Sequence, residues 1–549
     1  MKFKSCLLAL AILFISSGFT SPIETNSDPI PRPKLVVGIM IDQMRWDYLY
    51  LFHERYGSDG FKRILKEGFS NENTYIDYIP TVTGIGHSTV YTGSVPAIHG
   101  ITGNSITFNT TGETVNCVGD ASVESVGTTS DHGKRSPVNM LSNTIGDELK
   151  LATNFRSKVI GISLKDRGAI LPAGHAADAA YWFEAKTGKW VSSTYYMEEL
   201  PKWVDNFNGR NYASKYLKKD WNTLYDIKTY TQSTADNKPY EGTLKGQDEA
   251  VFPVKTSKLF TKDDYSVIYT TPHGNSILLD FAKETIDKEN LGKGEDTDLL
   301  AISLSSTDAI GHTFGVNSVE VEDTYLRLDK ELGAFFKYLD QKIGKGKYTI
   351  FLTADHGANH NPQFLHENKL PVHTVKSNLK EDLNELLKKR FQVDGLVNST
   401  GYNQVRFDYK LINEHQLDEQ EMRDICMRYL RRNPEILFVA DFNKIGDAAI
   451  PEQIKQRMIN SHHPERTGGI HFVFNADAKS LTTKGSGHSV WNPDDARIPM
   501  LWMGWGIKNG RSSQQAHMSD IAPTLAYLLK IQVPNGSIGK VLNEILIEE

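Results

Sequence analysis

The segment LVVGIMID, from Leu35 to Asp42, decides the fold class of this chain. Its first seven residues are mostly apolar and rich in Val and Ile, which favours a strand that is covered on both faces, as the strands of parallel sheets are. Asp42 stands where that strand ends. Because open α/β sheets bind their ligands beyond the carboxyl ends of the strands, we expect Asp42 to be a functional residue.

An apolar run followed by polar side chains recurs three more times. The runs and the polar residues after them are KVIGISL (158–164) with Lys165 and Arg167, LLAISL (299–304) with Asp308 and His312, and YTIFLT (348–353) with Asp355 and His356. Each polar residue alone is compatible with a cap or a turn, but four strands that end in charged or metal-capable residues indicate one site. We therefore predict an α/β fold with a mostly parallel central sheet flanked by helices.

The length of the chain predicts either two domains or one large α/β domain with inserted segments. The chain has 549 residues, more than one simple domain usually holds. We expect a catalytic domain over residues 21–549, with cap or subdomain insertions at about 175–295 and 362–484. The net charge of −6 and the pI near 6.3 give no basic footprint for nucleic acid. No internal stretch reaches the roughly 20 apolar residues that a membrane helix needs.

The first 20 residues have the features of a secretory signal peptide. Two lysines precede an apolar run that is short for a membrane span, and small residues follow it. We therefore expect a periplasmic or secreted protein that is cleaved near residue 20 and has no stable membrane insertion afterwards. Cys117 and Cys426 remain in the mature chain, and the sequence leaves open whether they meet to form a disulfide.

Thr83 follows Pro80, Thr81 and Val82 and stands where a helical pattern begins. A hydroxyl at this position is either a helix cap or a nucleophile at the positive end of a helix, where backbone N–H groups favour a phosphoryl group. Asn104 ends the Gly-rich stretch HGITGN, and on its own it is a turn residue.

Lys165 and Arg167 are either a solvated rim or an anion clamp, because both cations suit a phosphate group. His488 lies in the Gly-rich stretch KGSGH, where a ring has little core to contact, so the sequence favours a ligand role for it. The candidate metal ligands are then three Asp and three His: Asp42, Asp308, His312, Asp355, His356 and His488. This mixture of oxygen and nitrogen ligands suits zinc, and six ligands suffice for two ions that act on one in-line displacement.

The ordered set of these motifs resembles the alkaline phosphatase superfamily, and most closely its PafA-type bacterial phosphatases, which use a Thr nucleophile. The resemblance runs through nearly the whole mature chain, and every motif stands in the order of that family. It implies that Thr83 attacks phosphorus and forms a phosphothreonine intermediate. It also implies two zinc ions per chain, one held by Asp42, Thr83, Asp355 and His356 and the other by Asp308, His312 and His488.

The same resemblance implies that Asn104, Lys165 and Arg167 bind the non-bridging phosphoryl oxygens. A phosphate monoester is a dianion and favours extra positive charge, whereas related phosphodiesterases lack the Lys and Arg pair. We therefore expect a broad-specificity phosphatase for small-molecule phosphate monoesters that acts as a monomer. The alternatives are a phosphodiesterase or nucleotide pyrophosphatase on the same two-metal site, and a secreted metal-binding protein without activity. A sulfatase is disfavoured, because sulfatases of this superfamily need a Cys or Ser nucleophile in a different motif. A phosphoglycerate mutase is disfavoured as well, because the related mutases are cytosolic and this chain has a predicted signal peptide.

Overall fold

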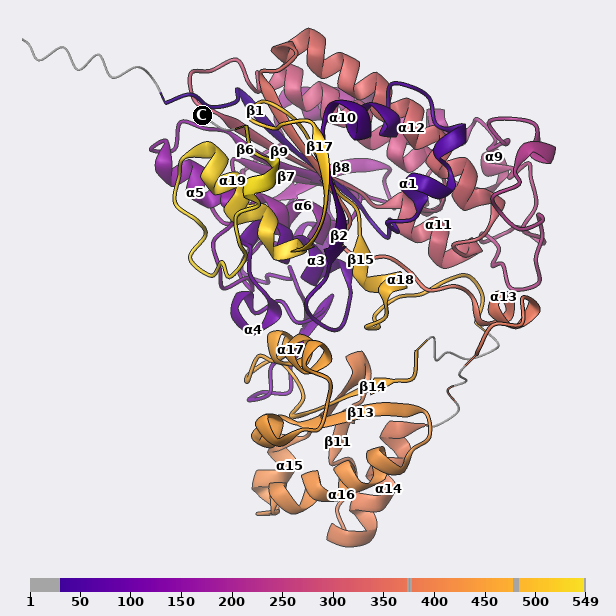
Figure 1. The fold of residues 1–549 in the computed structure, drawn as a ribbon, viewed down its shortest axis with the longest axis vertical. Coiled ribbons are helices and arrows are strands. Elements are labelled where there is room, and N and C mark those ends of the chain that lie inside the picture. Colours follow the sequence, from indigo (N-terminus) through magenta and orange to yellow (C-terminus); the bar gives the residue numbers. More distant parts are fainter. Residues whose placement is uncertain (1–29, 373–374, 376–377, 477–482, 548–549) are drawn as a thin grey trace, which may run out of the picture. The chain divides into compact units, whose positions relative to one another are not determined.

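The computed structural model describes residues 30–372, 375, 378–476 and 483–547 (Figure 1). The described residues from Arg32 onward belong to the larger of two compact units. The predicted signal peptide, residues 1–20, lies outside the described residues. Among the helices that are described, none combines the length and the apolar character needed to span a membrane.

An 11-stranded sheet forms the centre of the larger unit. The strands run in the order β15 (Arg497–Ile498), β2 (Phe69–Tyr75), β16 (Met500–Gly504), β10 (Tyr348–Thr353), β1 (Leu35–Ile41), β9 (Asp298–Leu304), β6 (Val159–Ser163), β7 (Ala179–Glu184), β8 (Lys189–Ser193) and β5 (Ser125–Val126), and β17 (Gly510–His517) pairs with β2. The five neighbours from β10 to β7 are parallel, whereas β16, β8 and β5 are antiparallel to their partners. The predicted mostly parallel sheet is thus confirmed.

β1 is the central strand of the sheet because its residues are apolar on both faces and all seven are buried. Leu35 lies opposite Asp298 of β9 and Tyr348 of β10, so the three strands run level with one another. Their carboxyl ends therefore meet at one edge of the sheet, and the polar residues that follow each strand come together there.

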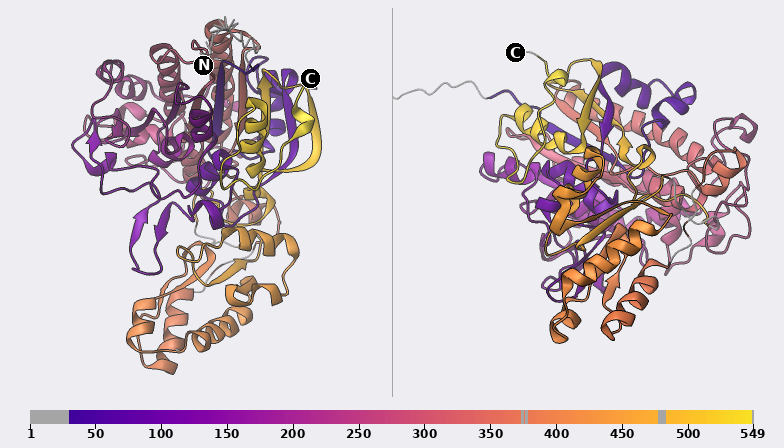
Figure 2. Two further views of the ribbon diagram at one scale, coloured as in Figure 1. Left: turned by 90° about the vertical axis from the view of Figure 1, so that its left-hand side faces the viewer. Right: turned by 60° about the horizontal axis from the view of Figure 1, so that its bottom comes forward.

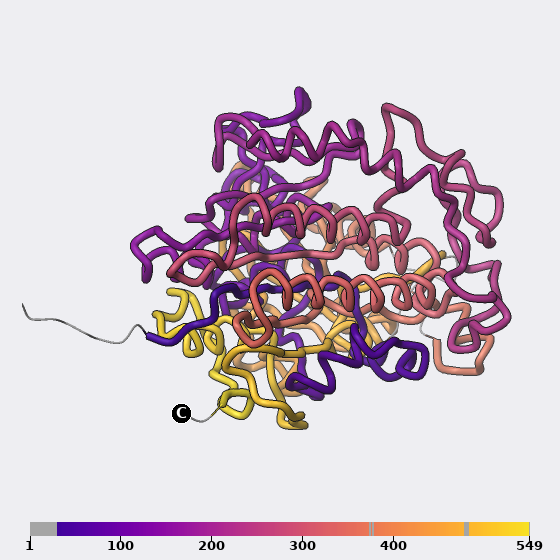
Figure 3. The backbone as a smooth tube through the Cα atoms, turned by 90° about the horizontal axis from the view of Figure 1, so that it is seen from above, coloured from indigo at the N-terminus to yellow at the C-terminus, as the bar shows by residue number. Residues whose placement is uncertain are grey.

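Helices cover both faces of this sheet (Figures 1 and 2). The helices α10 and α12 run side by side on one face, which the view in Figure 3 shows most clearly, and α3, α5, α6 and α19 pack together on the other. The helices of eight or more residues in the main part of the chain are α3 (Thr83–Thr92), α5 (Ile145–Ala152), α6 (Asp166–Ala173), α7 (Lys202–Gly209), α10 (His273–Lys288), α11 (Ser306–Phe314), α12 (Val319–Leu339) and α19 (Ile521–Leu529).

The segment between residues 362 and 484, predicted as an insertion, holds a second sheet with its own hydrophobic cluster. The order of its strands is β11 (Val397–Ser399), β12 (Gln404–Phe407), β14 (Ile470–Phe474) and β13 (Ile436–Asp441). The helices that pack with them are α14 (Leu379–Phe391), α16 (Glu419–Arg432) and α17 (Glu452–Ser461). The hairpin of β3 (Ser105–Thr107) and β4 (Thr114–Asn116) reaches this subdomain (Figure 2), where the Arg406 guanidinium donates to the Thr107 carbonyl at 3.2 Å.

The segment from 175 to 295 begins with β7 and β8, which extend the main sheet. The remainder carries short helices and ends in α10. Cys117 and Cys426, whose pairing the sequence left open, are both buried and unbonded. They lie in two separate hydrophobic clusters, so they do not form a disulfide with each other.

Candidate active site

All the predicted site residues except Asn104 and Thr83 lie shortly after a strand of the main sheet or in the loop that returns to this sheet. Asp42 comes one residue after β1, Lys165 caps α6 after β6, Asp308 and His312 lie on α11 after β9, Asp355 and His356 follow β10, and His488 lies in the loop before α18 (Pro493–Ala496). Thr83 is the first residue of α3, as the helical pattern predicted.

Six of these side chains form two groups that could each hold a metal ion. Asp42, Asp355 and His356 make one group and Asp308, His312 and His488 the other, and within each group the ligand atoms lie within 4.8 Å of one another. The groups are adjacent, because the His356 and His488 rings stack with centroids 3.7 Å apart. The grouping is the one that the family resemblance implied for two zinc ions.

The donor atoms of these groups fit divalent metal ions. Asp42 Oδ1, Asp355 Oδ2 and His356 Nε2 are buried and have no hydrogen-bond partner among the described residues. In all three histidines Nδ1 lies against a backbone carbonyl, which can only accept, so Nδ1 is the donor and Nε2 of the neutral ring is the nitrogen that a metal ion could bind. The acceptors are Gly357 for His356 at 3.0 Å, Ser486 for His312 at 2.9 Å and Thr81 for His488 at 2.6 Å.

The negative charges of the site also indicate that it binds cations. Burial and the neighbouring Asp42 carboxylate raise the pKa of Asp355 well above its usual value. Burial acts on Asp308 in the same direction, but the Lys165 ammonium and His312 lower the pKa of this carboxyl well below its usual value. Three buried carboxylates packed together are stable only with matching positive charge, which a divalent ion would supply.

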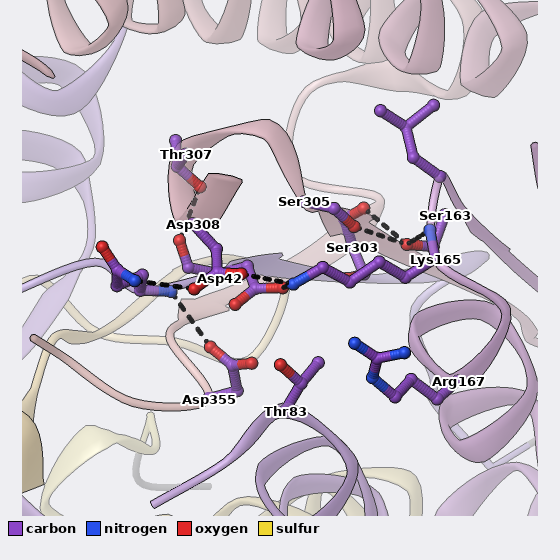
Figure 4. A network of polar contacts seen from close by, with 12 residues as sticks. Asp42, Thr83, Ser163, Lys165, Arg167, Ser303, Ser305, Thr307, Asp308 and Asp355 are labelled. Carbon is purple, nitrogen blue, oxygen red and sulfur yellow. Dashed lines mark hydrogen bonds and ion pairs between the residues drawn. The ribbon is translucent and has the colours of Figure 1, made fainter. Parts of the chain in front are cut away.

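Lys165 provides part of that positive charge. Its Nζ donates to Asp42 Oδ2 and to Asp308 Oδ2, each at 2.6 Å, so it touches one carboxylate of each group (Figure 4). Burial lowers the pKa of Lys165, but the two carboxylates raise it more, so the side chain stays an ammonium ion. The resemblance implied that Lys165 binds a non-bridging phosphoryl oxygen, and in this structure its hydrogen bonds go to the two carboxylates.

Arg167 approaches the same space and keeps free donors. Its guanidinium points toward Thr83 in Figure 4, and its buried Nε has no hydrogen-bond partner in the described part of the chain. The adjacent Asp166 lies 3.5 Å from Arg167 Nη1 and is held by Arg135 Nε at 2.9 Å. Burial lowers the pKa of Arg167, but the charge of Asp166 raises it. The side chain is therefore a permanent cation with donors available to an anion.

Small residues allow α3 to begin inside the site. A Cβ atom on Gly86 would lie 2.5 Å from the Asp355 carbonyl oxygen, so only glycine lets the helix pack against the end of β10. The Gly84 amide donates to Asn104 Oδ1 at 2.8 Å. This bond fixes the Asn104 side chain beside the helix N-terminus and leaves its amide nitrogen for another acceptor.

Two residues that contact the site, Gln43 and His87, were not predicted from the sequence. Gln43 has a left-handed backbone with φ of 67°, and it bridges both metal groups: its amide donates to Asp355 Oδ1 at 3.1 Å and its Nε2 to Asp308 Oδ1 at 2.7 Å. His87 is fully buried, and burial lowers its pKa to about 4. Its Nδ1 donates to the Thr83 carbonyl at 2.9 Å, a contact that the four-residue spacing on one helix could have indicated.

The fold and the site together define an α/β enzyme with paired metal-ligand groups and a threonine hydroxyl at a helix N-terminus. The family model for type I phosphodiesterase / nucleotide pyrophosphatase matches residues 36–496. Alkaline phosphatase PhoV of Synechococcus elongatus is 49% identical over 555 aligned residues and covers 100% of both chains.

A crystal structure of wild-type alkaline phosphatase PafA has a TM-score of 0.93 and 47% identity, and the match covers 95% of this chain and 100% of PafA. A second PafA structure, of a variant with one Thr, one Asn, one Lys and one Arg replaced, matches with a TM-score of 0.92 and 46% identity. This chain therefore belongs to the type I phosphodiesterase / nucleotide pyrophosphatase family of the alkaline phosphatase superfamily, and within it to the PafA-type alkaline phosphatases.

Proposed function

We propose that this protein is a two-zinc alkaline phosphatase that hydrolyses small-molecule phosphate monoesters through a phosphothreonine intermediate. The observation that carries the proposal is the arrangement of two adjacent ligand groups beside Thr83, with the guanidinium of Arg167 facing the same space. The family relationship supports it. The PafA variant with a replaced Thr, Asn, Lys and Arg supports the roles of Thr83, Asn104, Lys165 and Arg167, because these four residue types are the same.

In this proposal the Thr83 oxygen attacks phosphorus while the P–O bond to the alcohol breaks, and water later releases phosphate from the threonine. The helix N-terminus places backbone N–H groups and a partial positive charge at the phosphoryl group. Arg167 and Asn104 bind non-bridging oxygens, and Lys165 offsets the charge of Asp42 and Asp308. Zinc ions, held by the two ligand groups, would supply Lewis-acid stabilisation of the attacking and leaving oxygens.

The choice between monoesters and diesters follows from charge. Arg167 and Lys165 are two cations in a site with a buried hydroxyl, and a dianion gains more from them than a monoanion does. The family model also includes phosphodiesterases and nucleotide pyrophosphatases, so diester hydrolysis on the same site is the second candidate.

We also propose that residues 1–20 direct the protein to the periplasm or the medium, which detection of the mature N-terminus outside the cytoplasm would test.

The covalent step is tested by trapping the phosphoenzyme at low pH with a labelled monoester. We expect label on the wild-type enzyme and none on Thr83→Ala. Ser88→Ala is the matched control, because Ser88 is a buried hydroxyl on the same helix that donates to the Gly84 carbonyl at 2.9 Å. Full labelling of Thr83→Ala would overturn the assignment of the nucleophile.

A further inference from the structure

Thr81 connects the segment that carries the proposed nucleophile Thr83 to the loop that carries His488. Its side chain is fully buried, with an exposed fraction of 0%. The Thr81 carbonyl accepts a hydrogen bond from His488 Nδ1 at 2.6 Å, and the Thr81 hydroxyl accepts one from the Ser489 amide at 3.1 Å. Two consecutive residues of the loop are therefore attached to one residue of the segment that leads into α3.

Asp495 holds both sides of this connection. Its side chain is also fully buried, and its Oδ2 accepts from the Thr81 hydroxyl at 3.1 Å and from the Val490 amide at 3.0 Å. The Val490 carbonyl lies 3.3 Å from the same hydroxyl, but a carboxylate oxygen is the stronger acceptor. The Thr81 hydroxyl therefore donates to Asp495 and accepts from the loop, which fixes its orientation at both ends.

His488 depends on this connection for the direction of its ring. Its Nε2 lies 3.1 Å from His312 Nε2 and 3.8 Å from Asp308 Oδ1, so it faces the second ligand group. The face of the ring stacks on His356, with centroids 3.7 Å apart. Stacking alone allows a ring to turn in its own plane, whereas the bond from Nδ1 to the Thr81 carbonyl determines where Nε2 points.

The backbone of Asp495 also contacts the first ligand group. Its carbonyl accepts from the Gly357 amide at 2.7 Å, and Gly357 directly follows His356. The approach is close, because a Cβ on Gly357 would lie 2.1 Å from the Asp494 carbonyl oxygen. This contact involves main-chain atoms and does not need the Asp495 carboxylate. We therefore expect changes in the side chains of Thr81 and Asp495 to act on His488 rather than on His356.

We propose that Thr81 and Asp495 are positioning residues that orient His488 and thereby set the affinity of the second ligand group for its metal ion. The inference rests on the proposed function, because it concerns one of the two zinc ions of that site. Loss of a partner of a ligating histidine typically weakens metal binding 10–100-fold. A variant of the Thr81 side chain keeps the carbonyl that contacts His488, so we expect the lower end of this range, about tenfold.

The proposal is tested with Thr81→Val, which removes the hydroxyl and keeps a β-branched side chain. Zinc affinity is measured by competition with a chelator, and zinc content by mass spectrometry. We expect two zinc ions per wild-type chain, and in Thr81→Val about tenfold weaker binding of one ion with the other unchanged. Thr81→Ser keeps the hydroxyl and should bind both ions as the wild type does.

Thr92→Val is the matched control for the loss of a buried threonine hydroxyl. The Thr92 hydroxyl donates to the Ser88 carbonyl at 2.7 Å and accepts from the Ser94 amide at 3.2 Å, so it has the same kinds of partner as that of Thr81. Thr92 is the last residue of α3, at the end of the helix away from Thr83. Its replacement should leave both zinc affinities unchanged.

The zinc dependence of monoester hydrolysis gives a second readout. The activity of Thr81→Val should fall at low free zinc and recover in excess zinc, whereas a defect in folding would not recover. If Thr81→Val does not fold, Asp495→Asn takes its place, because a neutral amide oxygen is a weaker acceptor for the same hydroxyl. The same selective weakening of one zinc ion is then expected.

Two results would overturn the inference alone. They are wild-type zinc affinity in the folded variant and equal weakening of both ions. Fewer than two zinc ions on the wild-type chain would overturn the proposed function and this inference together, so the wild-type measurement separates the two failures.

Discussion

Replacement of Arg167 by Met should separate monoester from diester hydrolysis. Arg167 holds a buried Nε without a partner in the described structure, and its Nη1 lies 3.5 Å from Asp166, too far for a strong bond. Its donors are thus free for substrate. A hydrogen bond to a charged group contributes about 1.5–3 kcal/mol, so the loss of this fork from a dianion should cost about 3 kcal/mol, or about 10²-fold in kcat/KM.

A diester carries one negative charge less than a monoester. The same replacement should therefore lower kcat/KM for the diester by about tenfold or less. The assay is kcat/KM for an aryl phosphate monoester and for the matching diester on zinc-loaded enzyme. Arg167→Lys keeps the charge but loses the planar fork, and it should recover part of the monoester rate. Arg135→Met is the control, because Arg135 also binds Asp166 but donates its Nη1 to the Lys134 carbonyl at 2.8 Å. Equal losses on both substrates would refute the reasoning.

The remaining predictions concern metal retention, charge and pH. Gln43→Leu should weaken zinc retention about 10–100-fold, measured by competition with a chelator. Gly311→Ala should have the same effect, because a Cβ at this position would lie 1.9 Å from Gln43 Oε1 and displace that side chain. Zinc retention as in the wild type would contradict the role of Gln43. Lys165→Met should destabilise the zinc-free protein by about 3–5 kcal/mol in urea unfolding, since two buried carboxylates lose their partner. With zinc bound, the loss of stability should be clearly smaller. Equal losses of stability with and without zinc would contradict the role of Lys165 in balancing the carboxylate charge. Burial raises the pKa of Glu331 to about 7, so the folded protein keeps a proton that the unfolded chain has lost, and stability should fall as pH rises from about 4.5 to 7. Glu331→Gln should flatten this slope in unfolding measured across that pH range, and an unchanged slope would assign it to other groups.

The centre of the fold was predictable because each buried strand is a continuous apolar run. Residues 35–41 are apolar on both faces, and the structure buries all of them. The edges were less visible, because antiparallel strands such as β8 have mixed composition and gain their place from pairing with β7. Strand pairing between distant segments depends on tertiary contacts, which local pattern does not contain.

The ligand groups were predictable for a related reason: each ligand stands at a fixed distance behind a recognisable strand. Gln43 was not predictable, because its role depends on a left-handed backbone that a non-glycine residue adopts only when the surroundings impose it. For Lys165, the sequence indicated a cation for phosphate, and this remains a prediction. The structure adds that the Lys165 ammonium donates to Asp42 and Asp308.

The subdomain between residues 362 and 484 is also connected to the phosphoryl site in a way that only the structure reveals. Tyr402, with a left-handed φ of 55°, lies so close to the Asn104 turn that a Cβ on Gly103 would be 2.6 Å from its ring. The same turn carries the Asn104 side chain that binds the N-terminus of α3. Because the two segments lie about 300 residues apart in sequence, the contact depends on the fold of the whole subdomain. In the proposed function, Asn104 and Arg167 bind a phosphoryl group that all phosphate esters share, so selectivity among esters would come from parts that contact the rest of the substrate. We therefore expect the subdomain that borders Asn104 to be one such part.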